Sequence, residues 1–199
     1  MYCQVVLKLY NNLYETISTM LETNHSLHLK SYIQVFDVEV PESFLENLCA
    51  NASFTQALTG NEGKVNMNVR NCFSSEINKQ SNEHKIIWNN IDKLIKKYND
   101  GIEFKVEISE NHDGYNLLKY QENGFYKEHF DMALKPRTLS IIILLNDSFE
   151  GGELSFFRGT YTPSFRRNQA ILFPSNFLYP HQVTTVTKGE RYSIATWVI

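Results

Sequence analysis

The chain has 199 residues and a formal net charge of −3, from 19 basic and 22 acidic side chains. Hydrophobic residues make up 42% of it and aromatic residues 13%, a composition that can build a globular core. The acidic balance excludes the broad basic surface typical of nucleic-acid-binding proteins, although a local basic patch stays open.

Cysteine usage and the first residues indicate an intracellular protein. Cys3, Cys49 and Cys72 are odd in number and widely spaced, so we expect idle thiols rather than disulfides or a Cys-rich zinc site. The first residues lack the basic start and cleavage site of a signal peptide, and no apolar run reaches the roughly 18 residues that span a bilayer. We therefore expect a soluble cytoplasmic protein without a membrane partner.

Helices are expected in the first half of the chain. Apolar residues recur at helical spacing over residues 5–22, and again over residues 84–98. Between these helices, residues 31–40 alternate as a strand does. A helix over residues 41–54 should follow, because its first residue is a proline, which costs no hydrogen bond in the first helical turn.

Residues 59–82 are rich in Gly, Asn and Ser and are too long for a simple connector. We expect a loop here, either a lid that shapes a substrate site or a surface loop. It contains Arg70, which is a candidate residue for the substrate pocket.

After Gly101 the pattern changes to short strands separated by Gly, Pro, Asn or Asp. Many short strands at this spacing are typical of a β-sandwich, jelly roll or barrel, with the preceding helices on one outer sheet face. No internal repeat interrupts the chain, so a single domain is expected. The predicted strands cover residues 104–109, 115–120, 124–131, 138–147, 153–157, 169–173, 182–186 and 191–199.

The segment GFYKEHFD, residues 124–131, places a histidine two positions before an aspartate on a predicted strand. Because residues i and i+2 of a strand point to one face, His129 and Asp131 project together, opposite Phe130 and Met132. An imidazole nitrogen and a carboxylate oxygen suit a divalent transition metal. By itself, the pair is equally consistent with polar residues on an exposed strand.

A third candidate ligand is His181, in NFLYPHQVTTV at the entrance of a later predicted strand. From there it can reach across a barrel to the His-x-Asp pair, whereas an ordinary surface histidine is the alternative. The remaining histidines lie in predicted loops or helices without a carboxylate at matching spacing, and we interpret them as solvated: His25, His28, His84 and His112.

Ten residues after His181, Arg191 begins a strand on which it shares a face with Ser193, Ala195 and Trp197. If that face is interior, the cation needs an anion, because an unpaired buried charge is costly. A guanidinium binds a carboxylate through two hydrogen bonds, so a ligand's carboxylate would serve, whereas a surface arginine is the alternative. Two histidines and one carboxylate on one side of a metal leave open coordination positions, as in non-haem Fe(II) oxygenases.

Three segments resemble the Fe(II)/2-oxoglutarate dioxygenases, and within them the prolyl 4-hydroxylase-like group. LLKYQENGFYKEHFD is similar to that group's Y-x-x-x-G-x-Y-x-x-H-x-D segment. RTLSIIILLND with EGGELSFF is similar to its strand, Asn and Gly-Gly-x-Leu hairpin, and ILFPSNFLYPHQVTTVTKGERYSIATWV to its distal His, Arg and Trp block. The resemblance covers residues 115–198; residues 31–49 are a fainter match, and the first 28 residues match no family.

The resemblance implies a mainly β fold with flanking α-helices. Its core would be a double-stranded β-helix (jelly roll, cupin-like), with N-terminal helices packed on the outer sheet. Within a single domain over residues 1–199, residues 1–28 would form a helical extension. Residues 29–110 would supply supporting strands and helices, and residues 111–199 the catalytic core.

The resemblance also implies a set of site residues. Fe(II) would be held by His129, Asp131 and His181, and 2-oxoglutarate would be bound by Arg191. Two further residues would contact the co-substrate, and three would line the substrate pocket, with aromatic core packing as the alternative for the aromatic ones. These residues are Tyr120 and Ser193 for the co-substrate, and Tyr126, Trp197 and Arg70 for the substrate.

The implied activity is hydroxylation of an unactivated C–H bond by O₂, with 2-oxoglutarate decarboxylated to succinate and CO₂. A peptidyl proline is the expected substrate, with a free amino acid or another small molecule as the alternative, and ascorbate is expected as reductant. Because the histidines must be neutral to bind the metal, iron affinity should fall at acid pH. One departure from the family is Leu144, which stands where several relatives have a tyrosine; Tyr120 would then bond the co-substrate.

Three rival functions differ in what they require. A nucleic-acid demethylase of the alkylation-repair type would carry a second arginine six residues after the first, where this chain has Trp197. A non-catalytic cupin-like module would usually lack a ligand or the arginine. A zinc hydrolase can use the same three ligands but has no need of Arg191.

Overall fold

The computed structural model describes residues 28–59, 63–102, 113–132 and 136–199. The chain divides into two compact units, Met1–Ile33 and Gln34–Ile199. In the first unit, residues 28–31 form a helical turn. The helix predicted over residues 5–22 and the strand predicted over residues 104–109 lie outside the described residues.

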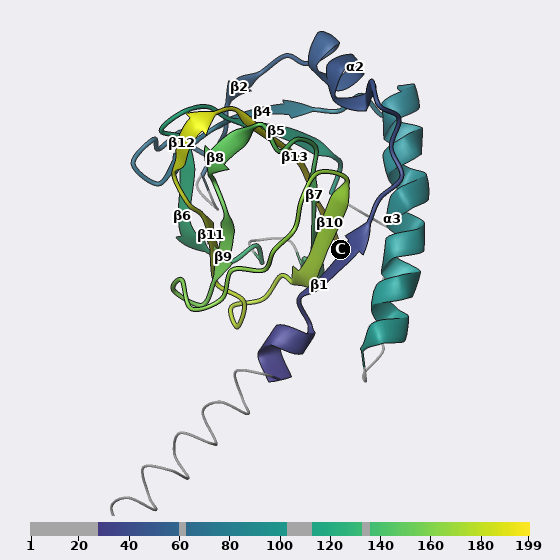
Figure 1. Ribbon diagram of the computed structural model, residues 1–199, viewed down its shortest axis with the longest axis vertical. Helices are drawn as coiled ribbons and strands as arrows, with labels where there is room; N and C mark the ends of the chain where they lie inside the picture. The colour runs from purple at the N-terminus through teal and green to yellow at the C-terminus, as the bar shows by residue number, and fades with distance from the viewer. Residues whose placement is uncertain (1–27, 60–62, 103–112, 133–135) are drawn as a thin grey trace, which may run out of the picture. The chain divides into compact units, whose positions relative to one another are not determined.

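Two antiparallel sheets face each other in the second unit (Figure 1). The larger sheet has the order β1 (Gln34–Asp37), β10 (Gln169–Pro174), β7 (Leu139–Leu144), β13 (Arg191–Val198), β5 (Asn116–Tyr120), β4 (Phe73–Glu76) and β2 (Thr55–Gln56). The smaller sheet has the order β3 (Arg70–Asn71), β6 (Phe125–His129), β11 (His181–Val183) and β9 (Leu154–Phe156). A separate pair joins β12 (Val186–Gly189) to β8 (Phe149–Gly151).

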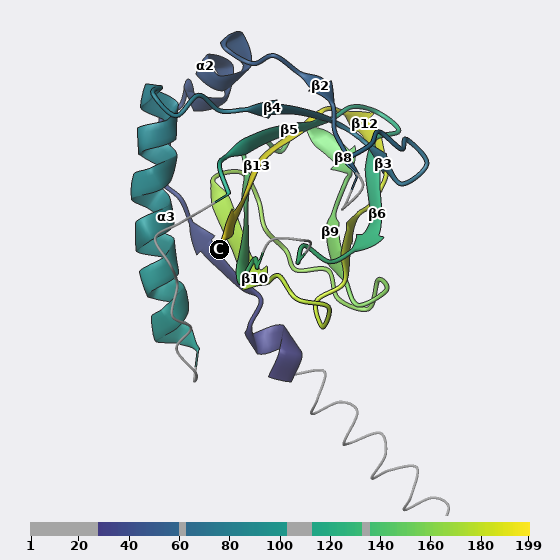
Figure 2. The same ribbon diagram turned by 180° about the vertical axis from the view of Figure 1, so that it is seen from behind.

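Strand β7 lies inside the larger sheet, between β10 and β13, and all six of its residues are buried. Burial on both faces explains why its sequence, LSIIIL, is almost continuously apolar rather than alternating. One face of the sheet lines the interior between the two sheets. Helix α3 (Asn82–Gly101) runs beside the same sheet on its outer side (Figures 1 and 2).

Helix α3 presents one apolar stripe. Its buried residues recur at helical spacing, and the Ser81 side chain accepts a hydrogen bond from the His84 amide at the helix start. The Asn90 side chain exchanges two hydrogen bonds with the Glu39 backbone, which ties the helix to the segment after β1. The buried residues of the stripe are Ile87, Ile91, Leu94 and Tyr98.

The predicted fold class is confirmed: a mainly β jelly roll with helices outside the larger sheet. The strand predicted over residues 31–40 is confirmed as the shorter β1. The helix predicted from residue 41 is confirmed, but α2 (Phe44–Ala50) starts three residues later and ends earlier. No helix among the described residues is long and apolar enough to cross a membrane.

The single loop predicted over residues 59–82 was wrong. This segment contains β3, which pairs with β6 of the smaller sheet, and β4, which pairs with β5 of the larger sheet. Strands of two and four residues carry too little alternation to be recognised locally, because their partners lie some fifty residues away along the chain. The strand predicted over residues 182–186 is likewise divided between β11 and β12, which belong to different sheets.

Candidate metal centre

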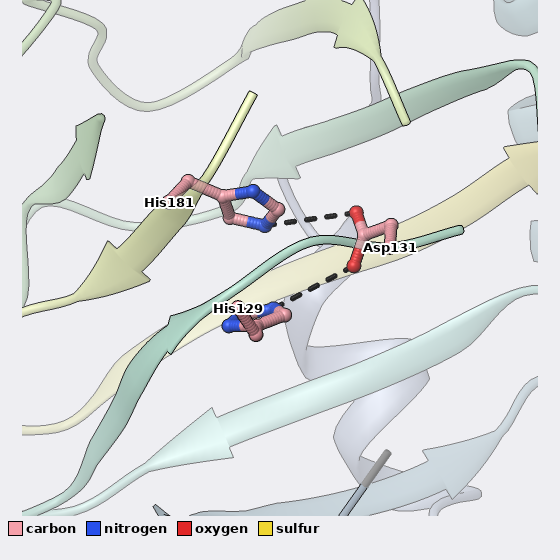
Figure 3. A group of neighbouring side chains, drawn as sticks. All are labelled: His129, Asp131 and His181. Carbon is pink, nitrogen blue, oxygen red and sulfur yellow. Dashed lines mark ion pairs between the residues drawn. The ribbon is translucent and has the colours of Figure 1, made fainter. Parts of the chain in front are cut away.

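The fold brings the three predicted metal ligands together. His129 ends β6 and is the direct cross-strand partner of His181 at the start of β11. Asp131 follows two residues after His129, just beyond the strand. One ligand atom from each residue lies within 4.8 Å of the other two, and both imidazoles are directed at the carboxylate (Figure 3). Three donors this close can share one metal ion.

Hydrogen bonds determine which imidazole nitrogen faces the carboxylate. Nδ1 of His129 lies 2.8 Å from the Lys127 carbonyl oxygen, and Nδ1 of His181 lies 3.1 Å from the Tyr179 carbonyl oxygen. A carbonyl oxygen only accepts, so each Nδ1 carries the proton and donates it. In the neutral form of each ring, Nε2 is then the nitrogen with the lone pair, and the two Nε2 atoms lie 3.5 Å and 3.6 Å from the Asp131 oxygens. This arrangement prepares both rings to bind a metal.

Burial and charge act in opposite directions on these ligands. Burial alone would raise the pKa of Asp131, but His181, His129 and a hydrogen bond from Trp197 hold this pKa far below its usual range. Burial lowers the pKa of the His181 imidazole to about 4, against the opposing effect of the Asp131 charge. At neutral pH the centre therefore presents a carboxylate and a neutral imidazole, the forms that bind a metal.

Two serines support the carboxylate from behind. Ser140 Oγ donates to Asp131 Oδ2 at 2.7 Å and lies 2.7 Å from Ser175 Oγ, and both serines are buried. Neither serine was predicted as a site residue from the sequence. The signal was present in β7, where Ser140 is the only polar residue in a fully buried strand.

Arg137 also contacts the segment that carries Asp131, and the sequence did not suggest this role. Its Nη2 donates to Asp113 Oδ2 at 2.6 Å, and its Nη1 to the Asp131 carbonyl oxygen at 3.2 Å. Its guanidinium carbon also lies 3.8 Å from the Trp197 ring centre. Arg137 therefore joins the segment that carries the ligand Asp131 to the strand that carries Trp197.

Arg191 is buried, with 2% of its surface exposed. Nη1 donates to Ser193 Oγ at 2.8 Å, whereas Nε has no hydrogen-bond partner. No carboxylate among the described residues pairs with this guanidinium. Burial lowers the pKa of Arg191, but an arginine stays charged at any ordinary pH. The fold therefore holds an uncompensated cation that would bind an anion.

Two features of the adjoining loops position Arg191. The Asn146 side chain donates to the Glu190 carbonyl oxygen at 2.7 Å and accepts from the Tyr192 amide at 2.8 Å. These two hydrogen bonds fix the backbone on both sides of the arginine. Gly152 has a φ of +67°, and a Cβ there would lie 3.0 Å from Arg191 Cδ. Only glycine leaves room for the arginine at this close approach.

The predicted co-substrate residues surround this cation. Tyr120 is the cross-strand partner of Arg191, is fully buried, and has its ring 5.5 Å from the guanidinium carbon. Burial raises the pKa of the Tyr120 hydroxyl well above its usual range, so it stays a hydrogen-bond donor. Ser193 lies opposite Leu144 on β7.

One cavity of about 370 Å³ contains the metal ligands, a size within the range of small-molecule sites. The three predicted substrate-pocket residues line it. Tyr126 stacks on His129, with ring centres 3.5 Å apart. The guanidinium carbon of Arg70 lies 4.6 Å from the centre of the Tyr126 ring. Tyr120 also lines the cavity, whereas Arg191 and Ser193 are not among its lining residues.

The other described histidines stay outside this centre. His28 is exposed, in agreement with the prediction of a solvated residue. For His84 that prediction was wrong, because its ring packs 4.5 Å from the Tyr115 ring and burial lowers its pKa. His25 and His112 lie outside the described residues.

The donor set fits Fe(II). Two imidazole nitrogens and one ionised carboxylate converge from one side and face an open cavity, and this leaves coordination positions free for other ligands. The hydrogen-bonded Nδ1 atoms and the Ser140 hydroxyl supply the outer contacts that metal ligands need.

Comparisons with known proteins agree with this centre. Residues 115–199 match the family model described as the 2OG-Fe(II) oxygenase superfamily. A PKHD-type hydroxylase of Alteromonas mediterranea is 33% identical over 93 residues, which span 40% of this chain and 40% of the relative's length. The match therefore covers well under half of that protein.

Two solved structures share the fold. A prolyl-4-hydroxylase of Pseudomonas putida has a TM-score of 0.67 and 20% identity, over 84% of this chain and 92% of that chain. A prolyl hydroxylase of Trichoplax adhaerens, in complex with a hypoxia inducible factor oxygen degradation domain peptide fragment, has a TM-score of 0.70 and 18% identity. That comparison covers 90% of this chain and 92% of the other.

Proposed function

We propose that this protein, whose residues 115–199 form a prolyl hydroxylase-like domain of the 2OG-Fe(II) oxygenase superfamily, is an Fe(II)- and 2-oxoglutarate-dependent hydroxylase. The observation that carries the proposal is the combination of two elements in one barrel. One is the convergent His129, Asp131 and His181 centre, and the other is the buried, unpaired Arg191. A zinc hydrolase would need the first element and not the second.

The proposal assigns metal binding to three residues and co-substrate binding to three others. The three ligands hold Fe(II), which when bound supplies the oxidising power to hydroxylate an unactivated C–H bond with O₂ and 2-oxoglutarate. Arg191 pairs with the distal carboxylate of 2-oxoglutarate, beside the hydroxyls of Tyr120 and Ser193. Tyr120 takes the hydrogen bond that relatives with a tyrosine at the Leu144 position would make.

The surrounding side chains orient the ligands and limit water. Ser140 keeps the Asp131 carboxylate in one orientation, and Tyr126 covers one face of the His129 ring. Phe156 and Phe173 pack around His181, with ring centres 5.6 Å and 4.8 Å away. A dry, rigid setting of this kind strengthens electrostatic interactions with a bound co-substrate.

A peptidyl proline is the substrate we propose, with succinate and CO₂ as co-products. The prolyl hydroxylase folds of the solved relatives support this choice, and one of them is in complex with a peptide fragment. The same centre would serve a free amino acid or another small molecule. The proposal also includes the domain organisation given above, with residues 1–28 as an extension, residues 29–110 as support and residues 111–199 as the catalytic core.

Succinate release tests the proposal. Protein purified without oxygen is loaded with Fe(II) and assayed with 2-oxoglutarate, O₂ and ascorbate, together with proline-rich peptides or free amino acids. We expect turnover in the wild type, none in His129→Ala, and a raised 2-oxoglutarate requirement in Arg191→Ala. Full activity in His129→Ala would reject the iron assignment. Tightly bound zinc without any 2-oxoglutarate turnover would reject the whole proposal in favour of a hydrolase.

A further inference from the structure

Arg70 is a second cation in this site, and no described carboxylate neutralises it. It lies on β3, is half-buried and lines the cavity that contains the metal ligands. Its Nη1 donates to the Leu58 carbonyl oxygen at 3.0 Å, and its Nε to Cys72 Sγ at 3.1 Å. Neither acceptor is a carboxylate. The other cavity arginine, Arg137, is different, because Asp113 pairs with it directly.

The guanidinium of Arg70 lies close to the metal centre. It is 4.6 Å from the Tyr126 ring centre, and that ring is stacked 3.5 Å from the His129 ring. The guanidinium carbon of Arg70 is therefore no farther from the His129 ring centre than the sum of these two distances, a span that a small substrate can bridge. The bonds to Leu58 and Cys72 use Nη1 and Nε, which leaves Nη2 without a partner among the described residues.

When Fe(II) and 2-oxoglutarate are both bound, the positive charge of Arg70 has no counter-charge in the site. The two charges of Fe(II) and the one of Arg191 are matched by the Asp131 carboxylate and by dianionic 2-oxoglutarate. Arg137 is matched by Asp113. The charge of Arg70 therefore stays uncompensated after metal and co-substrate have bound. A partly desolvated cation facing a cavity favours an anionic partner, and its fork of donors suits a carboxylate.

We propose that Arg70 binds a carboxylate of the substrate, so that the enzyme selects substrates with a negative charge beside the carbon that it hydroxylates. This inference rests on the proposed function. The apolar rim suits the rest of such a substrate, since Leu58 and Phe130 line the cavity with about half of their surfaces exposed. The carboxylate is supplied either by an acidic side chain next to the reacting residue of a peptide or by the carboxyl group of a free amino acid.

Paired substrate pools test the proposal and distinguish these two sources. One pool holds acetylated and amidated pentapeptides with a central proline and Glu, Gln, Asp or Asn on either side. The other holds free amino acids and their amides. Conversion is followed as the gain of one oxygen atom by mass spectrometry. Each acidic member has an uncharged partner of nearly the same shape, so their ratio reports the effect of charge alone.

The matched variants are Arg70→Gln, Arg70→Lys and Lys64→Gln. Lys64 is an exposed cation in the same segment that does not line the cavity, so its replacement controls for net charge. In the wild type and in Lys64→Gln, we expect carboxylate members of one pool to be converted at least about tenfold faster than their amides. Arg70→Gln should reduce this ratio to near one, and Arg70→Lys should keep part of it.

Succinate release without any second substrate separates the two proposals. It depends on the metal and co-substrate residues, so Lys64→Gln, which changes an exposed residue outside the cavity, should release succinate as the wild type does. Its absence in the wild type would contradict the proposed function itself. The Arg70 proposal fails if the wild type converts no member of either pool or shows no preference for carboxylates. It also fails if Arg70→Gln keeps the preference, or if Arg70→Lys, which retains the positive charge, loses it completely.

Discussion

At the scale of single residues, the sequence pattern identified the three candidate metal ligands, which the fold brings together, but not the residues that support them. His129, Asp131, His181 and Arg191 could be proposed because their side-chain chemistry is distinctive and their spacing matched a known arrangement. Ser140 could not be proposed, because no local sequence pattern distinguishes a serine that donates to a carboxylate from one that bonds to water. Its role depends on the pairing of β7 with β10 and β13, which brings it beside Asp131 and Ser175.

Replacing Ser140 by alanine should weaken metal binding. The substitution removes the hydroxyl that donates to Asp131 Oδ2, and loss of such an outer contact typically costs about tenfold or more in metal affinity. Anaerobic titration with Fe(II) or Mn(II) measures the change. Ser175→Ala, which removes only the hydroxyl behind Ser140, should have a smaller effect. Equal affinity in Ser140→Ala and the wild type would show that the carboxylate needs no such support.

Acidification should destabilise the metal-free protein through His181. Burial lowers its pKa from the ordinary histidine value of 6.5 to about 4. Between these two values the unfolded chain binds a proton that the folded protein does not, so stability is present above them and is lost as the pH falls. From this residue we expect a loss of about 2 kcal/mol in unfolding free energy between pH 7 and pH 5, measured by urea denaturation. In His181→Gln most of this difference should disappear; a difference of the same size in that variant would contradict the assignment.

At the scale of elements, strong local patterns were predictable and pairing was not. Helix α3 and strand β7 carry signals of their own, an apolar stripe and an apolar run. The short strands β3 and β4 carry none, and they exist because β6 and β5 offer them hydrogen-bonding edges. This matters for the site, because β3 delivers Arg70 to the cavity from a segment that was predicted to be a loop.

The connection between β8 and β9, which belong to different sheets, should be sensitive to a single methyl group. In Gly152→Ala the new Cβ would meet Val186 Cγ2 at 2.9 Å and Arg191 Cδ at 3.0 Å, so the arginine must move. We expect the KM for 2-oxoglutarate to rise severalfold, while Fe(II) affinity stays near that of the wild type. Steady-state kinetics with varied 2-oxoglutarate measures the change.

Gly159→Ala is the matched control for this experiment. Gly159 also has a positive φ, +83°, but a Cβ there meets nothing within 4 Å. Both variants carry the same backbone strain of about 1 kcal/mol, and only one of them disturbs Arg191. A similar KM in the two variants would show that backbone strain, rather than contact with the arginine, determines the effect.

At the scale of the whole molecule, the jelly roll explains why distant segments form one site. The smaller sheet contributes both histidines as cross-strand partners, and the larger sheet contributes Arg191 and its neighbours from β13. Fold class was predictable from the succession of short strands and from the family resemblance. The cavity and its uneven distribution of charge were not, because they depend on how the two sheets face each other.

The most direct test of the account is the binding of 2-oxoglutarate to protein loaded with Mn(II) under anaerobic conditions, followed by calorimetry. A centre that combines the three metal ligands with Arg191 predicts one bound 2-oxoglutarate per metal. Affinity should fall by about tenfold or more without the metal, and likewise in Arg191→Gln. Equal affinity with and without the metal, or in Arg191→Gln and the wild type, would contradict the claim that these residues form one co-substrate site.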